Sequence, residues 1–390
     1  MNLNSKKLQN IFIIVSFILL AIALRTMFIF IQTPDLTKFV FTWYDTLYKV
    51  GRIDALRINF YNYTPSYIYL IDIMTLFPWI GKLAAIKIIS MVFDFFAAAA
   101  VYQLVGIKTT RLFYKWIGFF ALLFLPTVII ESSVWGQVDI IYTAFLLWSL
   151  FFILKSKPGL AVLSFSIGFC FKLQAVFFLP IFLILFLHKK IIFSWFFLIP
   201  FTYFISILPC LVLGRSLTDL LSIYFQQIDV YHSLTMRAPN IYTFIQAGDN
   251  FNLIVRVGYG LTAAVILSYI LLRWLKWKKI NAESICFDAA FFTIIVPYLL
   301  PKMHERYFFT GGIFLLILTL LFRKQILSTI LIQVSLMLSF IPYFTGWSNN
   351  WVTIAAIINI FVLFFFFYYG KEQLFDTNSK LADSNPQMVK

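Results

Sequence analysis

Two carboxylates in the polar stretch at residues 31–67 have the type and position for acid–base chemistry. Asp35 follows Pro34 directly after the first apolar segment, and Asp45 comes ten residues later. A carboxylate at a membrane surface can take the proton from a hydroxyl group that attacks a reactive carbon. Asp35 is the first candidate for this base and Asp45 the second. Two structural interpretations stay open: Asp35 caps the next helix, and Asp45 faces water on an amphipathic helix.

Four basic side chains are candidates to hold a phosphate group: Lys172, His304 and Arg306 in polar turns between apolar segments, and Arg25 in the outer part of the first apolar segment. His304 would do so as a hydrogen-bond donor. Arginine suits phosphate because its planar guanidinium offers several donors, and cations beside a departing phosphate stabilise the charge that develops there. Three of these four side chains also have a structural interpretation. Lys172 can pair with Asp139 and Arg25 with Asp94, while Arg306 can extend its side chain to the membrane surface.

Polar and aromatic residues at the turns between apolar segments are candidates for a sugar or acceptor pocket: Trp135, Gln137, Asp139, Gln174, Asn62, Tyr63 and Glu305. Polar groups at such positions are costly unless they are paired or functional. For Asn62 and Tyr63 a structural turn is the stronger interpretation, because Pro65 is suited to begin a helix. Three histidines and three cysteines without metal-ligand spacing predict no metal cofactor, and the need for a divalent cation stays open.

The elements that carry these residues are predicted to be membrane helices. The chain is 62% hydrophobic and only 12% charged, whereas about a quarter of a soluble domain is charged. Apolar runs of about 20 residues, the length that crosses a bilayer as a helix, recur throughout the chain, and we predict an all-α polytopic membrane protein with about 12 spans. The spans are expected at residues 8–31, 82–106, 116–130, 140–154, 159–171, 175–187, 191–213, 257–275, 285–300, 308–322, 325–344 and 351–369.

Basic residues set the expected orientation of these spans. Lys6 and Lys7 precede the first span, and later basic clusters recur on the same side, which places both termini in the cytoplasm. The net charge of +15 therefore reflects membrane topology and not a nucleic-acid partner. All the polar corners then lie outside, on one membrane domain of residues 1–370, and residues 371–390 form a disordered cytoplasmic tail.

Two external loops are long enough to have structure of their own. The first, residues 31–67, is expected to contain an amphipathic surface helix from about Lys38 to Leu56, followed by a proline turn into a half-buried helix at 66–80. The second covers residues 214–256. Several neighbouring spans are shorter than about 20 residues. Short spans leave a recess above them, here on the outer side, where a lipid-borne head group would lie.

The joint occurrence of these motifs resembles the multispanning C-type glycosyltransferases, and within them the bacterial membrane proteins related to the second mannosyltransferase of GPI-anchor assembly. The resemblance covers most of residues 1–370. The residues that carry it are Asp35, Trp43-Tyr44-Asp45, Gly51, Phe60-Tyr61-Asn62-Tyr63-Thr64-Pro65, Trp135-Gly136-Gln137-Val138-Asp139, Lys172-Leu173-Gln174 and Met303-His304-Glu305-Arg306-Tyr307.

The resemblance implies an inverting transferase of a bacterial cell membrane that uses a polyprenyl-phosphate sugar, with Asp35 as its catalytic acid in the first external loop. The identity of the sugar does not carry over from the resemblance. The expected reaction moves mannose or another hexose to a hydroxyl of a lipid-linked or cell-wall glycan outside the membrane. The sequence departs from the pattern of this family at two positions, and both bear on the geometry of the site. Pro34 precedes Asp35 where relatives often have a small residue, and Thr64-Pro65-Ser66 lacks the second proline that relatives often have.

Other features of the sequence bear on competing functions. The chain contains no P-loop and no Gly-rich loop before a helix, which argues against a nucleotide-sugar donor. The alternative function is a transporter or flippase of a lipid-linked sugar. Such a protein is expected to have internal repeats and ionisable groups near the middle of the membrane. Here the charged motifs gather at one face, which favours the enzyme.

Overall fold

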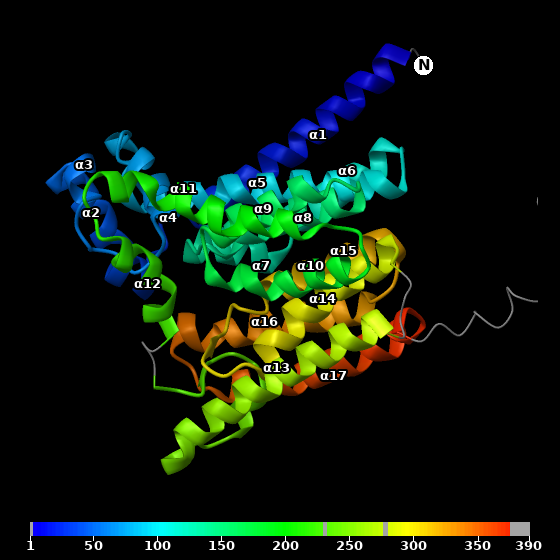
Figure 1. Ribbon diagram of the computed structural model, residues 1–390. Coiled ribbons are helices and arrows are strands. Elements are labelled where there is room, and N and C mark those ends of the chain that lie inside the picture. Colours follow the sequence, from blue (N-terminus) through cyan, green and yellow to red (C-terminus); the bar gives the residue numbers. More distant parts are fainter. Residues whose placement is uncertain (1–2, 229–231, 276–279, 375–390) are drawn as a thin grey trace, which may run out of the picture. The chain divides into compact units, whose positions relative to one another are not determined.

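The computed structural model describes residues 3–228, 232–275 and 280–374, and these are almost entirely helical (Figure 1). The predicted all-α class and the integral membrane character are confirmed. Of the predicted tail at 371–390, only the first four residues are described, as the end of α17, and the rest lies outside the described residues.

A helix is present at each of the twelve segments where a span is predicted. These helices are α1 (Leu3–Thr26), α5 (Lys82–Lys108), α6 (Leu112–Leu123), α8 (Asp139–Leu154), α9 (Pro158–Phe169), α10 (Leu179–Leu187), α11 (Leu198–Val212), α13 (Phe251–Leu275), α14 (Ala282–Leu299), α15 (Phe309–Phe322), α16 (Ile326–Thr345) and α17 (Asn350–Leu374).

Not all of these helices have the length of a full span. Within the described residues, seven helices are long and apolar enough to cross a membrane. An eighth is added if α6 and the segment that follows it, α7 (Pro126–Ile129) with the π-helix η3 (Ile130–Trp135), count as one span bent by 51°. Four apolar helices, at 139–154, 158–169, 173–187 and 309–322, are shorter. The count of about 12 spans therefore stays a prediction.

The chain divides into two compact units, each described here by itself. The first comprises residues 1–176 and 193–232, and the second residues 177–192 and 233–390. In the first unit α5 packs against α6 and α8, α8 packs against α9, and α9 packs against α11. The short helix η5 (Phe193–Phe197) leads into α11, and α12 (Leu217–Ile228) follows it.

The first polar loop of this unit is helical, as predicted. It contains the π-helix η1 (Leu36–Val40), α2 (Phe41–Val50), α3 (Arg52–Ala55), α4 (Pro65–Met74) and η2 (Pro78–Ile80). Gly51 separates α2 from α3 with φ of 101°, a value that L side chains rarely adopt. Trp43, Tyr44 and Leu47 form the buried face of α2, and Pro65 begins α4.

In the second unit α14 packs against α15, and α16 against both α15 and α17. The short helix η4 (Leu173–Phe178), which begins in the first unit and ends in the second, leads into α10. The part of the long loop in this unit contains β1 (Thr235–Met236), η6 (Ile241–Phe244) and η7 (Gly248–Asn250). β1 pairs in parallel with β2 (Met303–His304), with Thr235 opposite Met303. Hydropathy does not predict these two strands, because each is only two residues long.

Candidate active site

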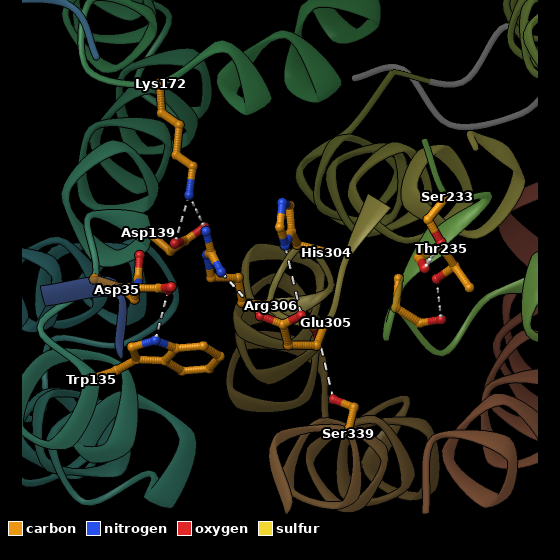
Figure 2. A network of polar contacts seen from close by, with 12 residues as sticks. Asp35, Trp135, Asp139, Lys172, Ser233, Thr235, His304, Glu305, Arg306 and Ser339 are labelled. Carbon is orange, nitrogen blue, oxygen red and sulfur yellow. Dashed lines mark hydrogen bonds and ion pairs between the residues drawn. The ribbon is translucent and has the colours of Figure 1, made fainter. Parts of the chain in front are cut away.

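The carboxylate of Asp35 is held by two donors from a distant part of the first unit. Its Oδ2 accepts a hydrogen bond from Trp135 Nε1 at 3.2 Å (Figure 2). It accepts another from Gln137 Nε2 at 2.9 Å. Asp35 is half-buried and stands at the start of η1, yet its side chain makes no capping hydrogen bond to the described backbone of η1. The capping interpretation of Asp35 is therefore wrong. Its side chain is oriented by the Trp135–Gln137 turn instead.

Local sequence explains how Asp35 comes to stand at this point. α1 ends at Thr26, and the chain continues through a turn to Pro34, which cannot donate a helical hydrogen bond and so suits the beginning of a new helix. Asp35 then precedes η1, and Trp135 ends η3. Both segments are π-helices, which are rare and often accompany functional sites.

Gly136 allows Trp135 and Gln137 to reach the same carboxylate. Its backbone is left-handed, with φ of 74° and ψ of 36°, and Gln137 N donates back to Glu131 O at 2.9 Å. A Cβ at this glycine would lie 3.2 Å from a methyl group of Leu36, the residue after Asp35. Both the backbone conformation and the space therefore call for glycine here.

We expect G136A to reduce any activity that depends on Asp35 by about tenfold or more, because a strained turn costs on the order of 1–3 kcal/mol and displaces both donors. The measurement is turnover of purified variant and wild type at equal amounts of folded protein. G81A is the matched control, since Gly81 also has positive φ, but a Cβ at Gly81 would meet no described atom within 4 Å. Equal loss in both variants would contradict a specific role for the Gly136 turn.

One face of α5 supports both halves of this arrangement. Lys87 Nζ donates to Phe28 O at 3.0 Å and to Ile31 O at 2.5 Å, so it holds the chain that leads from α1 to Asp35. Ser90 Oγ donates to Gln137 O at 2.7 Å, which anchors the turn on the other side. Lys87 and Ser90 are three residues apart and share a helix face. Neither was predicted as a site residue, although polar residues at helical spacing inside an apolar span were a signal.

Asp94 lies on the same face of α5, one turn beyond Ser90, and it fixes Arg25. Arg25 Nε donates to Asp94 Oδ2 at 2.7 Å, and its other nitrogens donate to backbone oxygens of α1 and α6. Ser132 Oγ donates to the same carboxylate at 2.6 Å. Of the two arrangements expected for Arg25, the structure contains the buried ion pair. We therefore leave Arg25 out of the proposed phosphate-binding set.

Lys172 and Asp139 also pair with each other. Lys172 Nζ lies 2.8 Å and 2.7 Å from the two carboxylate oxygens of Asp139 (Figure 2), and both side chains are buried. Asp139 is the first residue of α8, where the positive end of the helix dipole favours a carboxylate. This pairing is the structural alternative predicted for both residues. Gln174, two residues after Lys172, is half-buried, and its Oε1 has no hydrogen-bond partner among the described residues.

Asn62 and Tyr63 form the turn before α4. Asn62 is exposed, and its carbonyl oxygen accepts a hydrogen bond from Gln227 Nε2 at 2.5 Å. The ring of Tyr63 packs against Trp43 and Tyr67, at centroid distances of 5.2 Å and 5.8 Å. These contacts stabilise the turn, and they fit the structural interpretation better than direct contact with a ligand.

Asp45 forms an ion pair with Lys82 at 2.8 Å, with side chains that are about one-third exposed. Its carboxylate is thus already engaged with a surface cation, whereas Asp35 is oriented by two neutral donors. We expect D45N to keep activity within about threefold of wild type and to change stability by less than about 1 kcal/mol, as exposed pairs usually do. The measurement is turnover and thermal stability of the purified variant. A loss of activity equal to that of D35N would contradict this ranking.

In the second unit Glu305 lies between the two predicted phosphate ligands. Arg306 Nη1 lies 3.0 Å from Glu305 Oε1, and His304 Nδ1 lies 3.8 Å from Oε2 (Figure 2). Burial raises the pKa of the Glu305 carboxyl, but the hydrogen bond from His304 and the charge of Arg306 outweigh burial and hold that pKa below its usual range. Glu305 is therefore ionised at neutral pH, and it orients the side chains on either side.

Backbone hydrogen bonds hold the turn at His304–Arg306, here called the His304–Arg306 corner, in place. Glu305 N donates to Met236 O at 3.1 Å, and Lys302 N donates to Leu234 O at 2.8 Å. These bonds flank the β1–β2 pair and tie the long loop to the turn between α14 and α15. Asn240 continues the attachment through its Nδ2, which donates to Pro297 O at 3.3 Å. The positions of His304 and Arg306 thus depend on a loop that is distant in sequence.

Within the ranges that the structure describes, no three His, Cys, Asp or Glu side chains gather closely enough to hold a metal ion. The polar groups of the first unit instead form one connected set around Asp35: an oriented carboxylate, an indole donor, an amide donor and two supporting side chains on α5. Such a set can orient a base for proton transfer from a bound hydroxyl group.

Comparison with known proteins yields one family. The family model described as Glycosyltransferase family 87 matches residues 60–300, which is more than half of the chain. The matched range contains the Trp135–Asp139 turn and Lys172, whereas Asp35 and the His304–Arg306 corner lie outside it. No curated protein matches the chain.

Proposed function

Because the chain belongs to glycosyltransferase family 87 and is a C-type membrane glycosyltransferase, we propose that it transfers a sugar from a polyprenyl-phosphate donor to a hydroxyl outside the cytoplasm. The proposed sugar is mannose or another hexose, and the proposed acceptor is a lipid-linked or cell-wall glycan. We place the enzyme in a bacterial cell membrane, with both termini in the cytoplasm and the reaction on the outer side. The positions of the basic clusters support this orientation.

The proposed reaction is a single displacement that inverts the anomeric carbon. The acceptor oxygen forms a bond to the anomeric carbon while the bond from that carbon to the phosphate oxygen breaks, and polyprenyl phosphate leaves with the electron pair. Asp35 takes the proton of the attacking hydroxyl. A phosphate leaves readily as an anion, so one general base is sufficient on the acceptor side. Cationic donors near the phosphate stabilise the charge that it gains.

The observation that carries this proposal is the orientation of the Asp35 carboxylate. Trp135 and Gln137 both donate to its Oδ2, at 3.2 Å and 2.9 Å. Two donors on one oxygen fix the plane of the carboxylate, and a fixed base loses less entropy when the substrate hydroxyl arrives. Asp45 lacks such an arrangement, since it pairs with the partly exposed Lys82. Asp35 is therefore the proposed catalytic base, with Trp135 and Gln137 as its positioning residues.

Arg306 and His304 are the proposed ligands of the leaving phosphate. Both lie beside the carboxylate of Glu305, and a planar guanidinium carries five N–H donors in a geometry that suits a phosphate. Lys172 is proposed only as a positioning residue, because its ammonium lies against Asp139. Gln174, Asn62 and Tyr63 stay candidates for the pocket.

The test is a transfer assay in phospholipid vesicles that contain the purified protein. Labelled polyprenyl-phosphate mannose and polyprenyl-phosphate glucose are supplied with a glycolipid extract of the cell envelope. We expect the label to enter a new glycosidic bond that resists mild acid, which cleaves the sugar phosphate. Movement of the label between leaflets without a new bond would favour the transporter and contradict the proposal.

A further inference from the structure

One buried arginine in the first unit differs from the other buried cations of the described chain. Among the described residues of both units, six basic side chains are buried: Arg25, Lys87, Lys172, Arg215, Arg273 and Arg306. Four of them pair with a carboxylate: Arg25, Lys172, Arg273 and Arg306. Lys87 donates to two backbone oxygens in the segment that follows α1. Arg215 has neither kind of partner among the described residues.

The backbone brings Arg215 back onto the end of α11. Gly214 has φ of 101°, Gly214 N donates to Leu211 O at 3.0 Å, and Arg215 N donates to Cys210 O at 3.0 Å. This is the pattern of a helix C-terminus closed by a left-handed glycine. The cap directs the arginine side chain toward the first polar loop instead of into solvent.

The contacts of the guanidinium leave part of it unsatisfied. Nη2 donates to Asn59 Oδ1 at 2.7 Å, and the guanidinium carbon lies 4.4 Å from the centre of the Tyr61 ring. Nε and Nη1 are buried and have no hydrogen-bond partner among the described residues. Arg215 is 4% exposed, so the guanidinium lies below the protein surface.

The charge of Arg215 is therefore compensated only weakly. A neutral amide and an aromatic face attract a cation, and the C-terminus of a helix adds a favourable partial charge. An ionic partner would contribute more, because buried donors without acceptors cost about 1–3 kcal/mol each and more when they are charged. A planar guanidinium in this state has the charge and the donors to receive an oxyanion.

Asn59 provides the route to this group. It is exposed, although the guanidinium to which it is bonded is buried, so the cation lies one side chain below the surface. Rotation of the Asn59 side chain would remove its oxygen from Nη2 and expose the guanidinium. An anion can then take the place of the amide oxygen and gain a charge-assisted hydrogen bond.

We infer that Arg215, with Asn59 and Tyr61, forms a binding site for the phosphate of a lipid head group. None of these three residues is among those proposed above for proton transfer or for the leaving phosphate, and the sequence motifs give Arg215 no role. The choice of a lipid phosphate over a soluble anion rests on the proposed function, which brings phosphate-bearing lipids to the outer side.

Binding can be measured without any transfer reaction, so that failure of this inference and failure of the proposed function are distinguishable. Purified protein in detergent is titrated with three probes: undecaprenyl phosphate, phosphatidylglycerol and undecaprenol, which lacks the phosphate. We expect wild type to bind at least one phosphate lipid more tightly than undecaprenol, and R215Q to bind that lipid about tenfold more weakly, as expected for one lost charge-assisted hydrogen bond.

Three further variants make the test specific. R57Q removes an exposed arginine of the same loop, which is 55% exposed beside Asp54, and should bind like wild type. N59A removes the competing amide oxygen and should bind at least as tightly as wild type. R215K keeps the charge but not the planar fork, should bind several-fold more weakly, and replaces R215Q if that variant does not fold.

The pattern of losses identifies the source of the phosphate. A loss confined to undecaprenyl phosphate assigns the site to the polyprenyl carrier, and a loss confined to phosphatidylglycerol assigns it to a phospholipid or a phosphate-bearing acceptor. A loss for both assigns a general phosphate site. The inference is overturned if the folded Arg215 variants bind both phosphate lipids like wild type, or if wild type binds undecaprenol equally well.

Discussion

Replacement of Asp35 by Asn is expected to reduce sugar transfer by at least about a hundredfold, because a positioned general base contributes on the order of 10²- to 10⁴-fold to a reaction rate. Asparagine has nearly the same shape as aspartate, and its amide oxygen can still accept the hydrogen bonds from Trp135 and Gln137. The protein should therefore fold as before while the base is lost. Initial rates in the vesicle assay, at equal amounts of folded protein, provide the measurement.

Two companion variants separate the loss of the base from other effects of the D35N substitution. D35E keeps a carboxylate but moves it by one methylene, so it should retain more activity than D35N. D45N removes the second candidate base of the first loop, from an ion pair that is one-third exposed, and should remain active. If D35N turned over within about twofold of wild type, another group would have to accept the proton and the proposed mechanism would be wrong.

The second large effect is expected at the buried pair of Lys172 and Asp139. Removal of one partner takes from the other buried charge its ion-pair partner, and breaking a buried pair in this way costs about 3–5 kcal/mol. The two side chains are 6% and 0% exposed, so solvent cannot screen the remaining charge. We expect D139N and K172M each to lower the midpoint of thermal unfolding in detergent by about 10 °C, since 1 kcal/mol corresponds to about 2–4 °C in a domain of 150–250 residues.

A double-mutant cycle tests whether this effect comes from the pair itself. The double variant D139N/K172M removes both charges of the pair, so it should be more stable than the sum of the two single losses predicts. K82M is the matched control, because it breaks the exposed pair with Asp45 and should change the midpoint by only a few degrees. Single variants at the buried pair that were no less stable than K82M would contradict this account.

The support of Asp35 shows why parts of the site could not be predicted from the sequence. Asp35 and the Trp135–Gln137 turn were both named from the sequence, yet their contact was not, since the bonded residues are 100 and 102 positions apart. Lys87 and Ser90 were not named at all, and their importance appears only from the backbone oxygens that they hold. Arg215 was missed for the same reason. It stands out only because two of its buried nitrogens, Nε and Nη1, have no hydrogen-bond partner among the described residues.

Hydropathy alone determined the class of this protein, the positions of its apolar helices and the polar loop that carries Asp35. Each of these depends on the transfer of a local segment from water into lipid, and that free energy is a property of about 20 consecutive residues. The tertiary structure decided which of two partners Arg25 and Lys172 take, and it showed that Asp35 is oriented by a distant turn instead of capping a helix. Those outcomes depend on the packing of helices far apart in the chain, and a buried polar group takes whichever partner that packing brings within reach.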